Sequence, residues 1–360
     1  MSRTALATIH LGALRRNLAC VRERAGTAKV MAVVKADGYG HGLERVARAL
    51  SDADAFGVAA LGDGLRLRAA GIAKRIVVLS GPDETADLAE FRRLDLDAVI
   101  HHESQLAWLE ADLDARPLRV WLKIDTGMHR LGFAPDVARA ALSRLRALAN
   151  VDPDIVLMTH FAASDEFASN VTPTQIAAFD AATHDLSGTR SLANSAGVLG
   201  WPQSRHDWVR VGGLLYGLSV IEGKSGADLG FEPAMTLSTK LISVNRVRQG
   251  ERIGYAATFA CPEDMNIGVA AIGYGDGYPR SAPSGTPVLV NGARAAIIGR
   301  VSMDLITIDL RNVSAAKVGD RVMLWGRELP AETIAAQAGT ISYDLTCGMT
   351  KRVLFVEDDG

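Results

Sequence analysis

The first two thirds of the chain alternate between short apolar runs and longer amphipathic stretches. Helical periodicity lies between most of the runs. Within Glu44–Leu50 apolar residues repeat at helical spacing, as they do in the sets Leu88/Phe91/Leu94 and Leu106/Leu109/Leu113. Eight β/α units that close on themselves predict a (β/α)8 barrel, while the weaker later runs leave an open parallel sheet as an alternative. The eight strand-like runs are Val30–Val34, Phe56–Ala60, Ile76–Leu79, Ala98–Ile100, Leu118–Ile124, Ile155–Met158, Ser191–Ala193 and Trp208–Val211.

The pattern changes after about residue 232, where helical periodicity nearly disappears. Short β-branched segments follow one another, separated by turn pairs such as Asn291-Gly292, and one short helix is expected over Leu329–Ala338. We therefore predict a barrel over residues 1–231 and a β-rich domain over residues 232–360. The predicted strands of the second domain are Ile242–Val247, Ile267–Ile272, Pro287–Val290, Ala295–Ile298, Leu305–Ile308 and Val322–Leu324.

Composition narrows the class of protein. A length of 360 residues fits two domains, and 48% hydrophobic with 22% charged residues is typical of a globular protein rather than a disordered or fibrous one. A net charge of −2 gives no general attraction to nucleic acid. Three cysteines exclude a disulfide framework and fit a reducing compartment. Because no signal-peptide core or apolar run of membrane-spanning length is present, we expect a soluble, cytoplasmic protein.

A lysine at the end of the first strand-like run is the first candidate for chemistry. Lys35 follows the buried run Met31–Val34 and precedes a glycine-rich turn. In a barrel the carboxyl end of a strand faces the active site, and burial there lowers the pKa of a lysine. Such an amine can form a Schiff base and act as a proton acceptor. The alternative is a strand-end lysine whose side chain reaches solvent.

The stretch Val34–Gly42 (VKADGYGHG) resembles the pyridoxal-phosphate lysine motif of the alanine racemase family. The resemblance implies a barrel that binds pyridoxal 5'-phosphate, a β-domain, and a homodimer with shared active sites. It also implies interconversion of L- and D-alanine by a two-base mechanism on a pyridoxal-phosphate aldimine, supplying D-alanine for peptidoglycan or degrading it. Further motifs of the family are matched in order by Lys123–Gly132, Thr159–Ala162, Ala193–Gly197, Arg210–Gly217, Ile253–Tyr255, Gly273–Tyr278, Gly299–Asp304 and Tyr343.

Two segments suit a phosphate group. Asn194 and Ser195 follow the seventh run, and Gly212 and Gly213 follow the eighth, where barrels often bind phosphate. These residues could equally form ordinary turns. The resemblance assigns the phosphate to Tyr39, Ser195, Gly212 and Tyr343. The pair Gly212-Gly213 follows valine, whereas the family more often has Pro-Gly at this point.

The resemblance also assigns two bases. Lys35 would act on the D-alanine side, and Tyr255 of the partner subunit on the L-alanine side, supported by His160. Arg210 would face the pyridine nitrogen of the cofactor, and as a permanent cation it can only donate to that nitrogen. The alternatives are a buried structural role for Tyr255 and a surface ion pair between Arg210 and Asp207.

The remaining assignments concern the substrate carboxylate. The resemblance implies that Arg130 and the backbone N–H of Met303 contact it, and that Lys123, often carbamylated in the family, orients Arg130. Lys123 could instead be an outward-facing strand residue. His129 stands where the family often has glycine. We expect no metal site, because the adjacent histidines His101 and His102 would point to opposite faces of a strand.

Other functions compete with racemisation of alanine. A decarboxylase or a racemase of bulkier amino acids could use the same barrel. Tyr255 and Arg210 favour racemisation, and Tyr343 favours a small substrate if it narrows the path to the site. A catalytically silent pyridoxal-phosphate carrier would lack the β-rich third of the chain.

Overall fold

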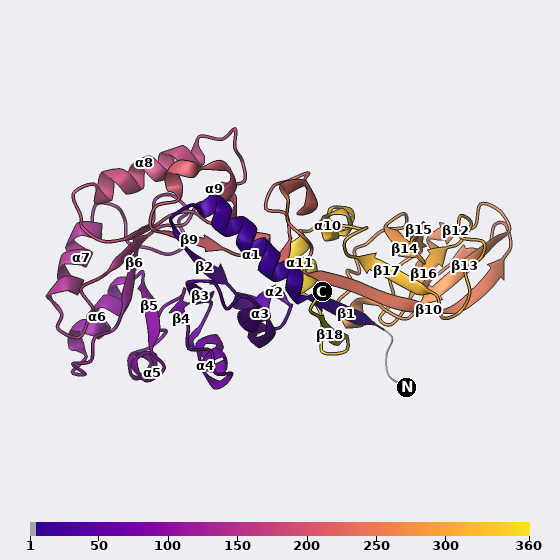
Figure 1. Ribbon diagram of the computed structural model, residues 1–360. Helices are drawn as coiled ribbons and strands as arrows, with labels where there is room; N and C mark the ends of the chain where they lie inside the picture. Colours follow the sequence, from indigo (N-terminus) through magenta and orange to yellow (C-terminus); the bar gives the residue numbers. More distant parts are fainter. Residues whose placement is uncertain (1–4) are drawn as a thin grey trace. The chain divides into compact units, whose positions relative to one another are not determined.

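A computed structural model describes residues 5–360, which divide into two compact units (Figure 1). The barrel unit comprises Asn17–Leu215 and Val220–Glu222. The β-rich unit comprises the described residues up to Arg16, together with Tyr216–Ser219 and Gly223–Gly360. These units differ from the predicted division at residue 232, because the N-terminal strand joins the β-rich unit. Its backbone hydrogen bonds go to strands near residues 235 and 354.

The barrel unit contains the closed eight-stranded barrel that the sequence predicted. Each of the eight strand-like runs forms a parallel strand, and β2 pairs with β9 to close the ring, which excludes the open sheet. Side chains including Met31, Val77, Trp121 and Trp208 fill its interior. The strands are β2 (Lys29–Val33), β3 (Ala55–Val58), β4 (Arg75–Val78), β5 (Leu96–Ile100), β6 (Val120–Lys123), β7 (Val156–Met158), β8 (Arg190–Ser191) and β9 (Trp208–Val211).

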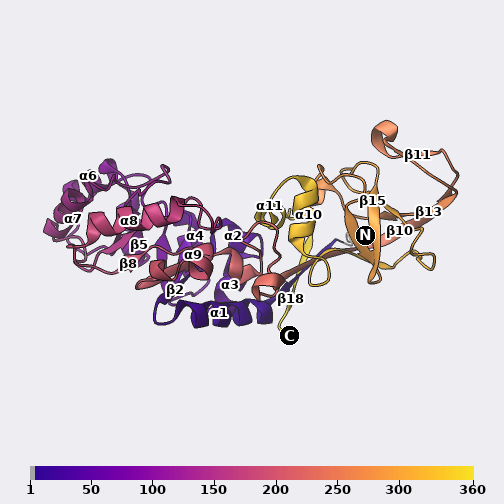
Figure 2. The ribbon, with the colours of Figure 1, turned by 90° about the horizontal axis from the view of Figure 1, so that it is seen from above.

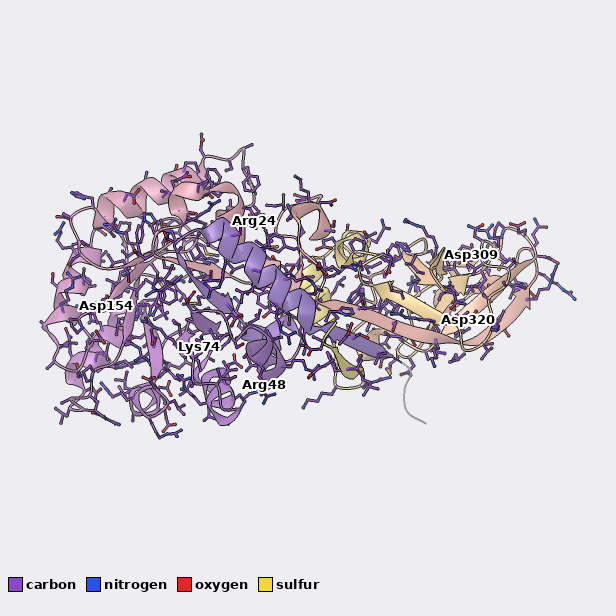
Figure 3. All side chains as sticks on the ribbon, in the orientation of Figure 1. Arg24, Arg48, Lys74, Asp154, Asp309 and Asp320 are labelled. Atoms are coloured by element: carbon purple, nitrogen blue, oxygen red, sulfur yellow. The ribbon has the colours of Figure 1, made fainter. Side chains whose placement is uncertain are left out.

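Helices surround these strands (Figure 1). Leu88 and Phe91 are buried as predicted, but Leu113 is 98% exposed, because its helix ends at Ala111. Charged side chains such as Arg48 and Asp154 are exposed on this unit (Figure 3). The helices up to the last barrel strand are α1 (Leu11–Ala25), α2 (Lys35–Tyr39), α3 (Leu43–Ala49), α4 (Leu61–Ala69), α5 (Asp87–Arg93), α6 (Glu103–Ala111), α7 (Ala138–Ala147), α8 (Val171–Thr183) and α9 (Ser195–Gly200).

The β-rich unit is built on one long strand, β10 (Met235–Val247). Its first half pairs with β1 and β17 and its second half with β13, so six strands of this sheet close on themselves. All six predicted strands are present. They are accompanied by β1 and β18, which the sequence analysis missed. The other strands are β1 (Leu6–His10), β13 (Met265–Ala270), β14 (Pro287–Val290), β15 (Ala293–Ile298), β16 (Ile306–Asp309), β17 (Arg321–Trp325) and β18 (Leu354–Asp358).

Smaller elements complete the β-rich unit. The predicted helix is α10 (Ala331–Ala338), and α11 (Ser342–Cys347) follows it unpredicted. A two-stranded sheet of β11 (Arg252–Ile253) and β12 (Phe259–Ala260) is separate from the large sheet, and β11 stands away from it in Figure 2. Across residues 5–360, no helix combines the length and the apolar character needed to cross a membrane.

Candidate active site

Lys35 lies immediately after β2, at the carboxyl end of the barrel, in a turn of left-handed backbone. Ala36, Asp37, Gly38 and Tyr39 have φ values of 54°, 54°, 64° and 52°. The Gly38 N–H donates to the carbonyl of Val34 at 2.9 Å, which holds this turn to the strand. Left-handed backbone costs about 1–2 kcal/mol per non-glycine residue, and such strain is concentrated at functional sites.

The carboxylate of Asp37 braces this turn from outside. It accepts from the backbone N–H of Leu43 at 3.2 Å and from the guanidinium of Arg66 at 2.8 Å. Arg66 also binds Glu44, at 3.0 Å. Sequence reasoning missed this function of Asp37, although its place inside the lysine motif was a signal.

A cluster of cations lies around the carboxyl ends of the barrel strands. Lys123, the last residue of β6, is 7% exposed, and burial lowers its pKa to about 8 with further lowering by Arg210 and Arg130. The charge of Lys35 lowers it too, so the two lysines share one electrostatic environment. The structure therefore brings Lys35, Lys123, Arg130 and Arg210 together, and Lys123 is buried within reach of the charges of the other three.

Arg210, on β9, is buried and held by carbonyl groups. Its Nη1 donates to the carbonyl and hydroxyl oxygens of Ser191 at 2.8 and 2.7 Å, and its Nη2 to the carbonyl of Thr159 at 2.6 Å. Burial lowers its pKa to about 10, which leaves it charged at neutral pH. Asp207 accepts instead from the backbone N–H of Arg190, so the surface pair considered as an alternative is absent here.

His160 is polarised by this arginine. The Nη2 of Arg210 lies 3.2 Å from His160 Nδ1, and because arginine only donates, Nδ1 is the acceptor. Burial, followed by the charge of Arg210, holds the pKa of His160 well below its ordinary value. The imidazole is therefore neutral, with its proton on Nε2.

Gln175 of α8 supports the loop that carries His160. Its side-chain N–H donates to the His160 carbonyl at 3.2 Å, and its oxygen accepts from the Ala162 backbone at 2.8 Å. Gln175 is buried and was not predicted, because a single glutamine on a helix carries no recognisable signal in one sequence.

Tyr39, Ser195 and Gly212 converge from three loops. The Gly212 N–H donates to Ser195 Oγ at 3.0 Å, and a Cβ at position 212 would lie only 2.3 Å from Tyr39 Oη. Asn194 caps α9 by accepting from the Gly197 N–H at 2.9 Å. Gly213 is buried and begins the next helical turn. The residues predicted to form the barrel's part of a phosphate site are therefore neighbours.

Arg130 extends from a loop that is fixed by Asp125. One carboxylate oxygen of Asp125 accepts from the N–H groups of Gly127, Met128 and His129, each at 3.0 Å. His129 has a φ of 54°, and its ring lies 3.4 Å from the other oxygen of Asp125. The turn thus requires a left-handed backbone at position 129. Glycine adopts this conformation freely, but here the residue is histidine.

Three candidate residues belong to the β-rich unit. Tyr255 opens a helical turn after β11 and is 70% exposed, so its alternative role as a buried core residue is wrong. Met303 is 51% exposed, and its carbonyl accepts from the Gly275 N–H at 2.9 Å. Tyr343 lies on α11 and is half-buried.

The adjacent histidines His101 and His102, which were not expected to bind a metal, have separate structural contacts. His101 is half-buried, and its Nε2 lies 2.9 Å from the Ser80 carbonyl, while His102 caps α6. Burial lowers the pKa of His101. In the part of the chain that the structure describes, no three His, Cys, Asp or Glu side chains group as metal ligands would.

Comparison with known proteins gives consistent results over both units. The family model described as "Alanine racemase, N-terminal domain" matches residues 9–220, and "Alanine racemase, C-terminal domain" matches residues 234–356. The alanine racemase of Shewanella baltica is 50% identical over 347 residues, which cover 96% of this chain and 97% of that protein.

Solved structures agree with this result. The biosynthetic alanine racemase of Pseudomonas aeruginosa superimposes with a TM-score of 0.96 at 43% identity, covering 99% of each chain. The fold is shared by the alanine racemase of Bartonella henselae, solved with covalently bound pyridoxal phosphate, at a TM-score of 0.90 and 24% identity over 99% of each chain. This chain belongs to the alanine racemase family.

Proposed function

We propose that the protein interconverts L- and D-alanine with pyridoxal 5'-phosphate bound at the carboxyl end of the barrel. The observation that carries the proposal is the convergence there of Lys35 with a buried arginine and the Tyr39–Ser195–Gly212 group. Because enantiomers have equal free energies, the reaction runs in whichever direction supply and demand set. It can supply D-alanine for peptidoglycan or degrade it. A cytoplasmic location belongs to the proposal, since low cysteine content is typical of proteins in reducing compartments.

The residues present fit the cofactor. A Cβ at position 212 would occupy the space beside Tyr39 Oη, so the glycine keeps that backbone open to an anion. The cationic cluster suits a phosphate and a carboxylate, both of which are anionic. We assign the cofactor to Lys35, Tyr39, His160, Asn194, Ser195, Arg210, Gly212, Gly213 and Tyr343.

When bound, the cofactor withdraws electrons from the α-carbon of an amino acid and so acidifies its α-proton. With the cofactor bound, Arg210 would limit this effect, because its guanidinium, with a pKa of about 10, would donate a hydrogen bond to the ring nitrogen and leave that nitrogen unprotonated. Neutral His160 beside it adds no second positive charge. Arg210 together with neutral His160 therefore favours proton transfer at the α-carbon over side reactions that need stronger withdrawal of electrons.

Racemisation removes a proton from one face of a planar carbon and returns one to the opposite face, which calls for a base on each side. Lys35 Nζ serves the face toward the barrel. Tyr255 Oη serves the other, and we assign it to the partner subunit of a homodimer. Tyr255 is highly exposed in the single chain, which leaves it accessible to a neighbouring molecule. Dimerisation is then a condition of catalysis.

Arg130 and the backbone N–H of Met303 hold the substrate carboxylate. Lys123 would orient Arg130 after carbamylation, in which its neutral amine attacks carbon dioxide, forms an N–C bond and loses a proton. A pKa of about 8 makes the neutral amine available at neutral pH. The carbamate replaces a positive charge with a negative one beside Arg130.

The test uses purified protein and L-alanine in heavy water. Alanine deuterated at the α-carbon should form in both configurations. Exchange with retained configuration, or release of carbon dioxide, would reject racemisation in favour of other chemistry.

The shared site has its own test. Mixed dimers of Lys35→Ala and Tyr255→Ala should regain part of the activity, because one of the two sites then has both bases. Mixed dimers without activity would reject the assignment of Tyr255 to the partner.

A further inference from the structure

A pocket within the β-rich unit has no part in the proposed reaction. Leu218, Pro233, Met235 and Ala331 are among the apolar residues that line it, together with the larger side chains Trp325 and Glu332. The empty space at the pocket, counted together with the open solvent at its mouth, is about 390 Å³, and its enclosed part is small.

Trp325, which lines the pocket, and Tyr278, which packs behind it, both have polar atoms without a hydrogen-bond partner in the described part of the chain. Trp325 and Tyr278 stack with ring centroids 6.1 Å apart, and each is 1% exposed. Within residues 5–360, neither Trp325 Nε1 nor Tyr278 Oη has a hydrogen-bond partner. A buried donor without a partner destabilises the fold, so an acceptor supplied from outside would relieve that penalty.

Glu332 gives the pocket an acceptor. Its Oε1 accepts from the Ser219 backbone N–H at 2.6 Å, and a carboxylate has further lone pairs to offer. Burial raises the pKa of Glu332, so the site disfavours additional negative charge. The rim arginine, Arg327, is paired with Glu232 at 2.8 Å. The pocket therefore suits a neutral group with one acceptor and one donor.

We propose that this pocket binds a small primary carboxamide, whose carbonyl accepts from Trp325 Nε1 and whose amide N–H donates to Glu332, with a short alkyl tail against the apolar walls. Binding is transmitted to α11. Thr346 lines the pocket, and its hydroxyl donates to the carbonyl of Tyr343 at 3.3 Å. This regulatory part rests on the proposed function, which gives Tyr343 a place in the active site.

Propionamide is the probe, added to the holoenzyme labelled with ¹⁵N at its tryptophan side chains. The chain has five tryptophans, and the indoles of Trp121 and Trp201 already donate to Asp97 and Ser164, which makes them internal controls. The Trp325 indole signal, identified as the one lost in Trp325→Phe, should move downfield and saturate while the others stay in place. Sodium propionate, the charged analogue, should produce no such shift.

Ala227→Leu is the blocking variant, because Ala227 lines the pocket and is exposed, so a larger side chain fits without disturbing the core. It should abolish the saturable shift. An unmoved Trp325 signal, a linear shift shared by all five indoles, or unchanged binding by Ala227→Leu would each overturn the site and leave water as its occupant.

The regulatory part is measured separately by alanine racemisation. Saturating propionamide should lower kcat/KM to a plateau above zero, and Ala227→Leu should remove that effect. Complete inhibition that Ala227→Leu does not relieve, or binding without any change in kcat/KM, would overturn the coupling. If the protein did not racemise alanine at all, the proposed function would fail while the indole titration still decided the site.

Discussion

Gly212→Ala tests the proposed cofactor site with a single added carbon. The new Cβ would lie 2.3 Å from Tyr39 Oη and 2.9 Å from the adjacent ring carbon, well inside the 3.4 Å of an ordinary contact. Tyr39 has little freedom to retreat, because its ring is rigid and its own backbone lies in the left-handed turn after Lys35. Gly212 itself is outside the positive-φ region, so alanine adds no backbone strain. The whole effect should therefore come from crowding between position 212 and Tyr39.

Overpacking of this kind costs about 1–3 kcal/mol. If the whole of this energy weakens cofactor binding, the affinity for pyridoxal 5'-phosphate should fall about 5- to 150-fold. The assay removes the cofactor with hydroxylamine, titrates it back, and follows the absorbance of the bound chromophore. Gly62→Ala is the matched control, because a Cβ there meets nothing within 4 Å. Wild-type affinity in Gly212→Ala, or an equal loss in Gly62→Ala, would refute the reasoning.

Three further predictions concern charge and backbone. For Lys123, the folded pKa of about 8 lies below the ordinary 10.5, so the unfolded chain binds more protons between these values. The free energy of unfolding of the uncarbamylated protein should rise from pH 8 to 10.5 in urea titrations, and a Lys123→Met variant with the same rise would contradict this. His129→Gly should raise stability by up to about 1 kcal/mol, since glycine adopts the φ of 54° without cost and the exposed ion pair that is lost contributes little; a lower Tm in calorimetry would count against it. Asp97→Asn should lower stability by about 3 kcal/mol, because the buried carboxylate binds Arg75 and Arg119 at 2.6 and 2.7 Å. Asp114→Asn, which removes a surface partner of Arg116, is its control and should leave the Tm nearly unchanged.

The barrel could be predicted because its strands are buried on both faces and read as continuous apolar runs, as in Ile76–Val78. The strand β1 could not, since Leu6–His10 is only five residues long and its partners lie more than 200 residues away. Leu113 was misassigned because periodicity alone does not mark where a helix ends.

The candidate site shows the same division between local and distant information. Lys35 and Gly212 stand at strand ends, and a strand count locates them. The dependence of His160 on Arg210 and Gln175 was beyond the residue pattern, because it joins three segments of the barrel through carbonyl groups and ring nitrogens. The left-handed backbone from Ala36 to Tyr39 was only partly visible, since alanine and tyrosine give no signal of a positive φ.

The place of β1 between β10 and β18 has a consequence for biosynthesis. His10 of β1 lies 2.9 Å from Asp358 of β18, two residues separated by 348 positions in the chain. The strand β1 is therefore synthesised long before β18, and its second edge stays unpaired until the residues near 358 have been made. During that interval the continuous barrel segment can fold by itself, while β1 stays an exposed edge open to pairing with other chains. Slow or interrupted translation should thus endanger the β-rich unit more than the barrel.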